Sequence, residues 1–165
     1  NALHIRKTWT TVQEMLSLAM DRARQKLDLY KVQVELEKEL PTIFVDAGSI
    51  SEVLYLLLDN AAKYSPEGSK IRIAARQINR DVEISVEDEG KGIAENDREK
   101  VFQKFTRVAP HRAPSTSDGL GLGLAIAKGI VESQGGRIWN EKAGGDFVTR
   151  FAFVLPIEEA KENRV

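Results

Sequence analysis

The chain has no cysteine and only two histidines, His4 and His111, among its 165 residues. The lack of cysteine excludes disulfide bonds, a thiolate nucleophile and any metal site with a Cys ligand. Two histidines that stand so far apart also argue against a histidine-rich zinc site. No apolar run approaches the roughly 18 residues needed to span a bilayer, and no signal peptide opens the sequence. We therefore expect a soluble part of a protein.

Charge of one sign is not in excess either, because 24 Lys and Arg residues face 25 Asp and Glu residues and leave a formal net charge of −1. This balance gives no support to nucleic-acid binding or to a basic module on a membrane surface. Hydrophobic residues make up 42% of the chain and charged residues 30%, which is typical of a globular protein. A chain of this length is expected to form one domain with a sizeable core.

Helices and strands are both expected, because apolar residues recur with two different spacings. Helical spacing predicts a helix at 12–27, a second that begins with a capping box at 49–52 and ends at 65–68, a short one at 101–105, and a last one that begins near 124 and stops at 135–136. Alternation predicts strands at 32–36, 42–45, 71–76, 82–87, 137–141 and 147–155, of which the last four form two hairpins. We therefore predict an α+β two-layer sandwich, in which about three helices cover one face of a mixed, mostly antiparallel sheet.

Asp88 departs from the apolar pattern of the strand that precedes it. Alternation places Val82, Ile84 and Val86 on the core side, and its continuation would place Asp88 there too. An unpaired buried carboxylate is costly, so Asp88 either caps a turn after the strand or has a partner. Two glycines follow closely and allow a near approach of bare backbone. A carboxylate in such a place suits a hydrogen bond from an exocyclic amine such as that of adenine.

Asn60, Lys63 and Tyr64 share one face at the C-terminal end of the second helix, since they stand three and four residues apart. They could form an ordinary solvated stripe. An amide oxygen, an ammonium group and an aromatic ring could also meet a hard cation, a phosphate and a base. Those are the three parts of a metal–nucleotide ligand.

Residues 119–124 read GLGLGL and stand between a polar segment, 109–118, and the last helix. Alternating glycines at a helix start expose N–H groups and the positive end of the helix dipole, which favour an anion. Two common phosphate loops do not match, because Lys128 is followed by glycine rather than Ser or Thr, and the dinucleotide fingerprint lacks its last glycine. The glycines could also serve only tight helix packing.

Four segments in this order resemble the ATP-binding catalytic domain of sensor histidine kinases, in the superfamily shared with gyrase, the Hsp90 chaperones and MutL. The segment LLDNAAKYSP at 57–66 is similar to the N box of that family, and DEGKGI at 88–93 to its first glycine box. FQKFTR at 102–107 resembles the F box, and GLGLGLAIAK at 119–128 the second glycine box. The resemblance covers about residues 12–156 and implies the Bergerat ATP-binding fold.

The resemblance also implies a role for each matched residue. Asn60 would ligate a Mg²⁺ ion that bridges the phosphates, and Lys63 and Arg107 would face phosphate oxygens, which makes these three the catalytic candidates. Tyr64 would pack on adenine, and Asp88 would accept a hydrogen bond from the adenine amine. A lid at 106–118 would begin at the F box and hinge at the second glycine box. The remaining residues implied to contact the nucleotide are Gly90, Gly92, Ile93, Phe105, Gly119, Leu120, Gly121, Leu122, Gly123 and Leu124.

One position departs from the family pattern. Relatives that hydrolyse ATP carry a glutamate four residues before the metal-binding asparagine, where it activates water, and here that residue is Leu56. Glu52, one turn further back, belongs to the expected capping box. The resemblance therefore implies transfer of the γ-phosphate to a histidine rather than efficient hydrolysis, since a neutral imidazole is already nucleophilic.

The acceptor histidine is expected to lie on a dimeric helical hairpin outside this chain, because neither the acidic residue nor the proline of the family motif follows His4. Residues 1–9 would then be the cut end of a preceding helical region, 10–156 the catalytic domain and 157–165 a charged tail. The implied partners are ATP, the dimerisation domain of the same protein and a response regulator, with no nucleic acid. The fragment would be a cytoplasmic monomer, and the full-length protein a homodimer attached to the bacterial inner membrane.

Two alternative functions remain at this point. An anti-sigma-factor-type serine kinase has the same fold, and phosphorylation of a histidine hairpin would distinguish the two kinases. The second alternative is a module without kinase activity. If it only binds a partner protein, a nucleotide titration would show no binding. A chaperone or topoisomerase ATPase is disfavoured by Leu56 and by the short chain.

Overall fold

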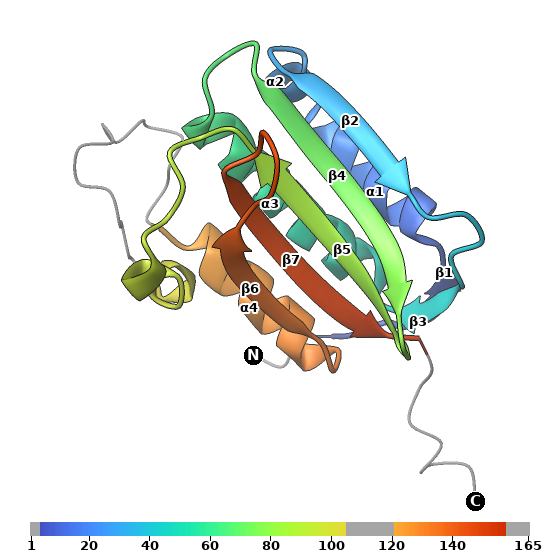
Figure 1. The fold of residues 1–165 in the computed structure, drawn as a ribbon. Helices are drawn as coiled ribbons and strands as arrows, with labels where there is room; N and C mark the ends of the chain where they lie inside the picture. The colour runs from blue at the N-terminus through green and yellow to red at the C-terminus, as the bar shows by residue number, and fades with distance from the viewer. Residues whose placement is uncertain (1–3, 105–120, 158–165) are drawn as a thin grey trace, which may run out of the picture.

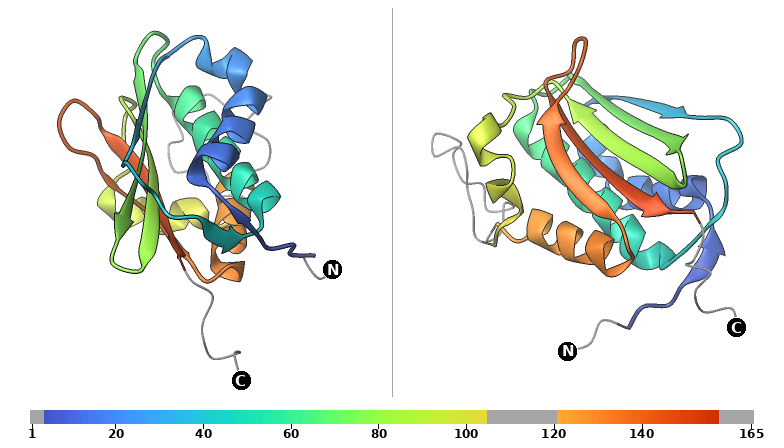
Figure 2. Two further views of the ribbon diagram at one scale, coloured as in Figure 1. Left: turned by 90° about the vertical axis from the view of Figure 1, so that its right-hand side faces the viewer. Right: turned by 60° about the horizontal axis from the view of Figure 1, so that its bottom comes forward.

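The structure, a computed structural model, describes residues 4–104 and 121–157. A five-stranded sheet and a layer of helices on one of its faces make up most of this part of the chain (Figures 1 and 2). In chain order the elements are β1 (Thr8–Thr10), α1 (Val12–Arg22), α2 (Arg24–Leu27), β2 (Lys31–Leu36), β3 (Ile43–Val45), α3 (Ala47–Tyr64), β4 (Lys70–Ile78), β5 (Asp81–Asp88), the 3₁₀ helices η1 (Glu95–Asp97) and η2 (Lys100–Phe102), α4 (Gly123–Ser133), β6 (Arg137–Lys142) and β7 (Thr149–Pro156).

The larger sheet has the strand order β2–β4–β5–β7–β6. β2 runs parallel to β4, and the other neighbouring pairs are antiparallel. The hairpins β4–β5 and β6–β7 are the two that the alternating sequence predicts. The predicted α+β sandwich, with helices on one face of a mixed sheet, is therefore confirmed (Figure 2).

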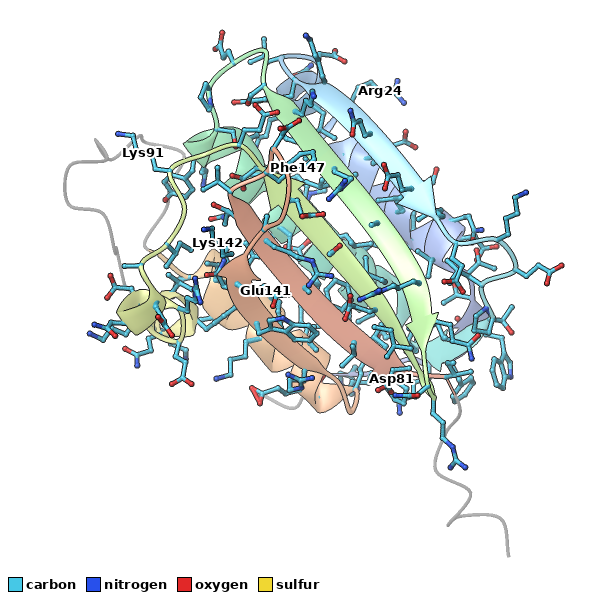
Figure 3. The ribbon with its side chains drawn as sticks, in the orientation of Figure 1. Arg24, Asp81, Lys91, Glu141, Lys142 and Phe147 are labelled. Atoms are coloured by element: carbon cyan, nitrogen blue, oxygen red, sulfur yellow. The ribbon has the colours of Figure 1, made fainter. Side chains whose placement is uncertain are left out.

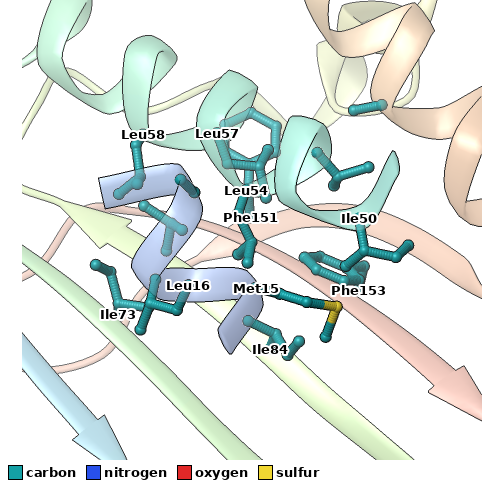
Figure 4. Packing of buried hydrophobic residues seen from close by; sticks show 14 of the residues in the cluster. Met15, Leu16, Ile50, Leu54, Leu57, Leu58, Ile73, Ile84, Phe151 and Phe153 are labelled. Atoms are coloured by element: carbon teal, nitrogen blue, oxygen red, sulfur yellow. The ribbon is translucent and has the colours of Figure 1, made fainter. Parts of the chain in front are cut away.

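The hydrophobic core lies between the sheet and the helices, and α3 contacts α1, α4 and β5. One apolar stripe of α3 is buried, and it consists of Ile50, Val53, Leu54, Leu57, Leu58 and Ala61. Figure 4 shows this stripe packed against α1 and the sheet, through Met15, Leu16, Ile73, Ile84, Phe151 and Phe153. Burying one large apolar side chain stabilises a fold by about 1.5–3 kcal/mol, so this stripe holds α3 firmly in place.

The start of α3 differs from the sequence prediction. The helix begins at Ala47, and its N-cap is Asp46, whose Oδ1 accepts a hydrogen bond from the Ser49 N–H at 3.1 Å. Glu52 forms an ion pair with Arg22 of α1 instead of closing a capping box. The predicted capping box at 49–52 is therefore wrong, because an aspartate three residues earlier already satisfies an N–H group of the first turn.

Three shorter segments also differ from what the sequence pattern predicts. The first long helix is divided at Ala23 into α1 and α2. The short helix predicted at 101–105 is the 3₁₀ helix η2, which begins one residue earlier and ends at Phe102. Thr8 and Trp9, at the end of the predicted cut end 1–9, form β1 together with Thr10; β1 pairs with β3, and Trp9 packs on Phe44 with ring centroids 5.2 Å apart.

The helices leave one face of the sheet uncovered (Figure 3), and ion pairs between strands lie on that face. Glu83 and Glu87 of β5 point away from the core, yet they are only 6% and 5% exposed. Arg72 of β4 contacts Glu87 at 2.7 Å, and Arg150 of β7 contacts Glu83 at 2.6 Å and also Glu141 of β6. These arginines cover the carboxylates and satisfy their charge.

We predict that Asp46→Ala lowers the free energy of unfolding by about 1 kcal/mol, the usual effect of losing an N-cap, whereas Ser49→Ala is nearly neutral. Partial burial acts to raise the pKa of Asp46, but hydrogen bonds from the Arg6 and Ser49 N–H groups outweigh it and lower the pKa below 3.8. The contribution of Asp46 is therefore present above that value and is lost as the pH falls through the lowered pKa. Urea unfolding of both variants at neutral and acidic pH measures this difference. Equal losses in both variants would contradict the assigned cap.

Candidate nucleotide-binding site

A small pocket lies where the last turns of α3 meet the start of α4 and η2. Its lining residues are Leu56, Asp59, Asn60, Lys63, Tyr64, Val101, Gly121, Gly123 and Leu124. The face of α3 that the sequence analysis selected therefore adjoins the second glycine segment, more than 50 residues further along the chain. The pocket brings an amide, an ammonium group, a phenol ring and a helix N-terminus together.

Two contacts hold the C-terminal end of α3 in position. The Tyr30 hydroxyl donates to the carbonyl of Ala62 and lies 3.0 Å from the carbonyl oxygen of Ser65. Burial, together with the negative charges of Glu67 and Asp88, raises the pKa of Tyr30, so the hydroxyl stays protonated as a donor. The tyrosine thus satisfies carbonyl groups that a helix end leaves unpaired.

Asp88 is the last residue of β5 and is only 2% exposed, as strand alternation predicts. Its Oδ1 accepts a hydrogen bond from the Gly90 N–H at 2.8 Å, so it also caps the turn after the strand. The two expectations for Asp88, an inward carboxylate and a turn cap, therefore both apply.

Gly90 connects this turn to α3. A Cβ atom at this position would lie 2.6 Å from the Tyr64 carbonyl oxygen and 2.8 Å from Asp88 Oδ1. Only glycine allows that approach, so the first glycine segment packs directly against the end of α3. Asp88 and Gly90 thus adjoin Tyr64, which itself lines the pocket.

Not every matched residue of the described chain lines the pocket. Gly92, which has φ +75°, approaches Val148, and Ile93 packs against the core cluster. Leu122 is the N-cap of α4 rather than a lining residue. Phe105, Arg107, Gly119 and Leu120, the lid at 106–118 and His111 lie outside the described residues.

The start of α4 has the features of an anion site. Its N-cap Leu122 has no polar side chain to cap the first turn, so N–H groups there can meet a ligand. Gly121 has φ +70°, which glycine adopts at little cost. A Cβ at Gly123 would lie 3.5 Å from Leu56 Cδ2, an ordinary contact, so Leu56 packs against this turn. The position where hydrolysing relatives carry a base is thus filled by an apolar contact.

Asp59 lines the pocket and pairs with Lys26, which lies next to the site; neither is among the residues that the sequence pattern selects. Asp59 Oδ2 lies 3.0 Å from Lys63 Nζ, and Asp59 Oδ1 forms an ion pair with Lys26 of α2. Burial lowers the pKa of Lys26, but hydrogen bonds to Asp59 and to the Tyr55 hydroxyl outweigh it and raise the pKa above 10.5. The four-residue spacing of Asp59 and Lys63 in the sequence predicts an ion pair on one helix face. No such spacing links Lys26 to Asp59, since the two stand 33 residues apart.

Two features are absent from the described residues. No group of three or more His, Cys, Asp or Glu residues there could hold a metal ion. None of the helices in the same residues has the length and apolar character that crossing a membrane requires.

We predict that Gly90→Ala weakens Mg-ATP binding at least tenfold and destabilises the fold, because the added methyl group must displace the Tyr64 carbonyl. Gly129→Ala in α4 is the matched control, since a Cβ there meets no atom within 4 Å. Alanine in a helix interior should stabilise the control slightly. Calorimetric titration and thermal unfolding measure both effects. Unchanged nucleotide affinity in Gly90→Ala would show that this contact does not shape the site.

The chain resembles known proteins in sequence. Residues 45–159 match the family model of histidine kinase-, DNA gyrase B- and HSP90-like ATPases. The chain is 37% identical over 164 residues to the sensor histidine kinase WalK of Bacillus subtilis, a match that covers 95% of the chain and 26% of WalK. It is 36% identical over 156 residues to the sensor protein KdpD of Clostridium acetobutylicum, covering 93% of the chain and 17% of KdpD. The chain therefore spans about a quarter or less of the length of these relatives.

Solved structures resemble the chain over nearly its whole length. The mycobacterial sensor histidine kinase MprB has a TM-score of 0.78 and 28% identity, over 92% of this chain and 97% of that one. The histidine kinase ThkA in complex with the response regulator protein TrrA has a TM-score of 0.77 and 25% identity, over 93% of this chain and 42% of that one. Since the family model matches well over half of its residues, the chain belongs to the histidine kinase-, DNA gyrase B- and HSP90-like ATPases.

Proposed function

We propose that this chain is the ATP-binding catalytic domain of a sensor histidine kinase, which transfers the γ-phosphate of ATP to a histidine on a dimerisation hairpin of the same protein. The observation that carries the proposal is the meeting of Asn60, Lys63 and Tyr64 with the start of α4 in one pocket. The relatives with sensor-kinase names support this activity within the family, and they give no support to a serine kinase.

Residues in the pocket and next to it fit both ends of a nucleotide. Asp88 can accept a hydrogen bond from the adenine amine, and the Gly90 N–H holds its Oδ1 next to the end of α3 that carries Tyr64. Lys63 and the N–H groups at the start of α4 can meet phosphate oxygens at the other end. Arg107, in the matched F box, is proposed as a further phosphate ligand.

Mg²⁺ also fits the donor set. Asn60 offers a neutral amide oxygen, whereas both carboxylate oxygens of the neighbouring Asp59 are engaged by lysines. A site with one protein ligand is typical of Mg²⁺ that is held mainly by phosphates and water. When bound, the ion would neutralise charge between the phosphates. Asn60 would orient it, and Lys63 would stabilise charge on the transferred group.

Transfer is favoured over hydrolysis by the residues around Asn60. Leu56 packs on the first turn of α4, and Glu52 is held by Arg22, so neither supplies a base for water.

We further propose that the full-length protein is a membrane-attached homodimer whose partner is a response regulator. The complex of ThkA with TrrA supports that class of partner.

We predict that Asp88→Asn weakens ATP binding by about ten- to a hundredfold, because a charge-assisted hydrogen bond to the adenine amine is lost. GTP binding should change far less, since guanine presents no matching amine there. Asp81→Asn, at the opposite end of β5, is the control. Isothermal titration with both nucleotides is the measurement. Equal ATP affinity in the wild type and in Asp88→Asn would refute the adenine assignment.

For the metal, we predict that Asn60→Ala abolishes the gain in ATP affinity that Mg²⁺ gives the wild type, while binding of metal-free ATP changes little. The exposed Asn96 of η1 provides the control variant Asn96→Ala. Titrations of ATP with and without Mg²⁺ measure the effect. If Asn60→Ala keeps the full effect of the metal, another group holds the ion.

A further inference from the structure

Ion pairs between the helices α1 and α2 and one side of α3 lead along α3 to the candidate site. Arg22 forms an ion pair with Glu52, and its guanidinium lies 3.7 Å from the centroid of the Tyr55 ring. Lys26 donates to the Tyr55 hydroxyl at 3.0 Å and pairs with Asp59. The series therefore ends in the pocket, where Asp59 also pairs with Lys63.

The charges of Lys26, Asp59 and Lys63 together act on a ligand in the pocket. A lysine that pairs with an aspartate one turn away on the same helix forms a nearly neutral couple, and its attraction for phosphate is weakened. Here Asp59 is shared between two lysines, which lie on opposite sides of its carboxylate. Lys26, Asp59 and Lys63 together thus carry one net positive charge instead of none.

We propose that Lys26 is a further determinant of polyphosphate binding, which balances the charge of Asp59 and so leaves the charge of Lys63 effective toward the phosphates. The inference rests on the proposed function and adds to it a residue outside the four family segments. The ammonium group of Lys26 need not touch the nucleotide, because the effect acts through Asp59. It therefore grows with the number of phosphates on the ligand.

The first test compares Mg-ATP, Mg-ADP and adenosine in titrations of the wild-type chain and of Lys26→Met. We expect Mg-ATP to bind about two- to fivefold more weakly to the variant, the size of effect that one charge several ångströms away produces near a surface. The loss should be smaller for Mg-ADP and absent for adenosine. High salt should reduce it, since screening weakens interactions between partly exposed charges.

Two matched variants separate charge from packing. Lys26→Arg keeps the positive charge and should keep the affinity for Mg-ATP. Lys128→Met removes a lysine of similar exposure, 48% against 42%, which also pairs with a carboxylate, but its partner Glu132 does not line the pocket as Asp59 does. It should leave the affinity for all three ligands unchanged.

The second test reverses the sign of the effect. Asp59→Asn removes the negative charge and should strengthen Mg-ATP binding, whereas the double variant Lys26→Met/Asp59→Asn restores the net charge of the wild type and should bind nearly as the wild type does. If Asp59 served only to hold Lys63 in place, both variants would bind more weakly.

The outcomes distinguish this inference from the proposed function. Failure of the wild type to bind any adenine nucleotide would overturn both. Normal binding by the wild type, with no change in Lys26→Met or with equal losses for ATP and adenosine, would overturn only the role of Lys26. Weaker Mg-ATP binding by Asp59→Asn would do the same.

Discussion

The fixed position of α3 is the constraint on which the rest of the site depends. Its apolar stripe is buried against α1 and the sheet, and its polar last turns form one wall of the pocket. The Tyr30 hydroxyl contacts the carbonyl groups at its end, and Gly90, in the turn after β5, packs against the same end. Because one rigid helix does both tasks, the packing of the core sets the positions of Asn60 and Lys63.

Local patterns in the sequence were sufficient for the parts of the site that lie within one element. Helical spacing placed Asn60, Lys63 and Tyr64 on one face, and strand alternation placed Asp88 inward, as the structure has them. Competing local signals explain the error at the start of α3, since Asp46 and Ser49 are both good N-cap residues. Strand β1 has only three residues, and its partner β3 follows more than 30 residues later, so no local period marks it.

Contacts between side chains of different helices and strands could not be predicted from the sequence. The ion pairs of Lys26 with Asp59 and of Arg22 with Glu52 join residues about 30 positions apart, and charged residues of this kind occur along the whole chain. The resemblance to the family shows that Leu56 differs from the glutamate of relatives that hydrolyse ATP. Only the structure shows that Leu56 packs against Gly123, which explains why an apolar side chain suits position 56. Sequence patterns thus indicate which residues take part, and three-dimensional packing decides which of them act together.

The arginine–glutamate pairs on the uncovered face of the sheet have a consequence for strand alignment. Arg150 reaches Glu83 on one neighbouring strand and Glu141 on the other, so it ties β5, β7 and β6 together. If the register of β5 shifted by one residue, Glu83 would face the hydrophobic core and Ile84 would face water, since successive side chains point to opposite faces. Such a misaligned sheet would lose its ion pairs and bury unpaired carboxylates at the same time. The ion pairs of this polar face therefore make a shifted register of β5 less stable than the observed one.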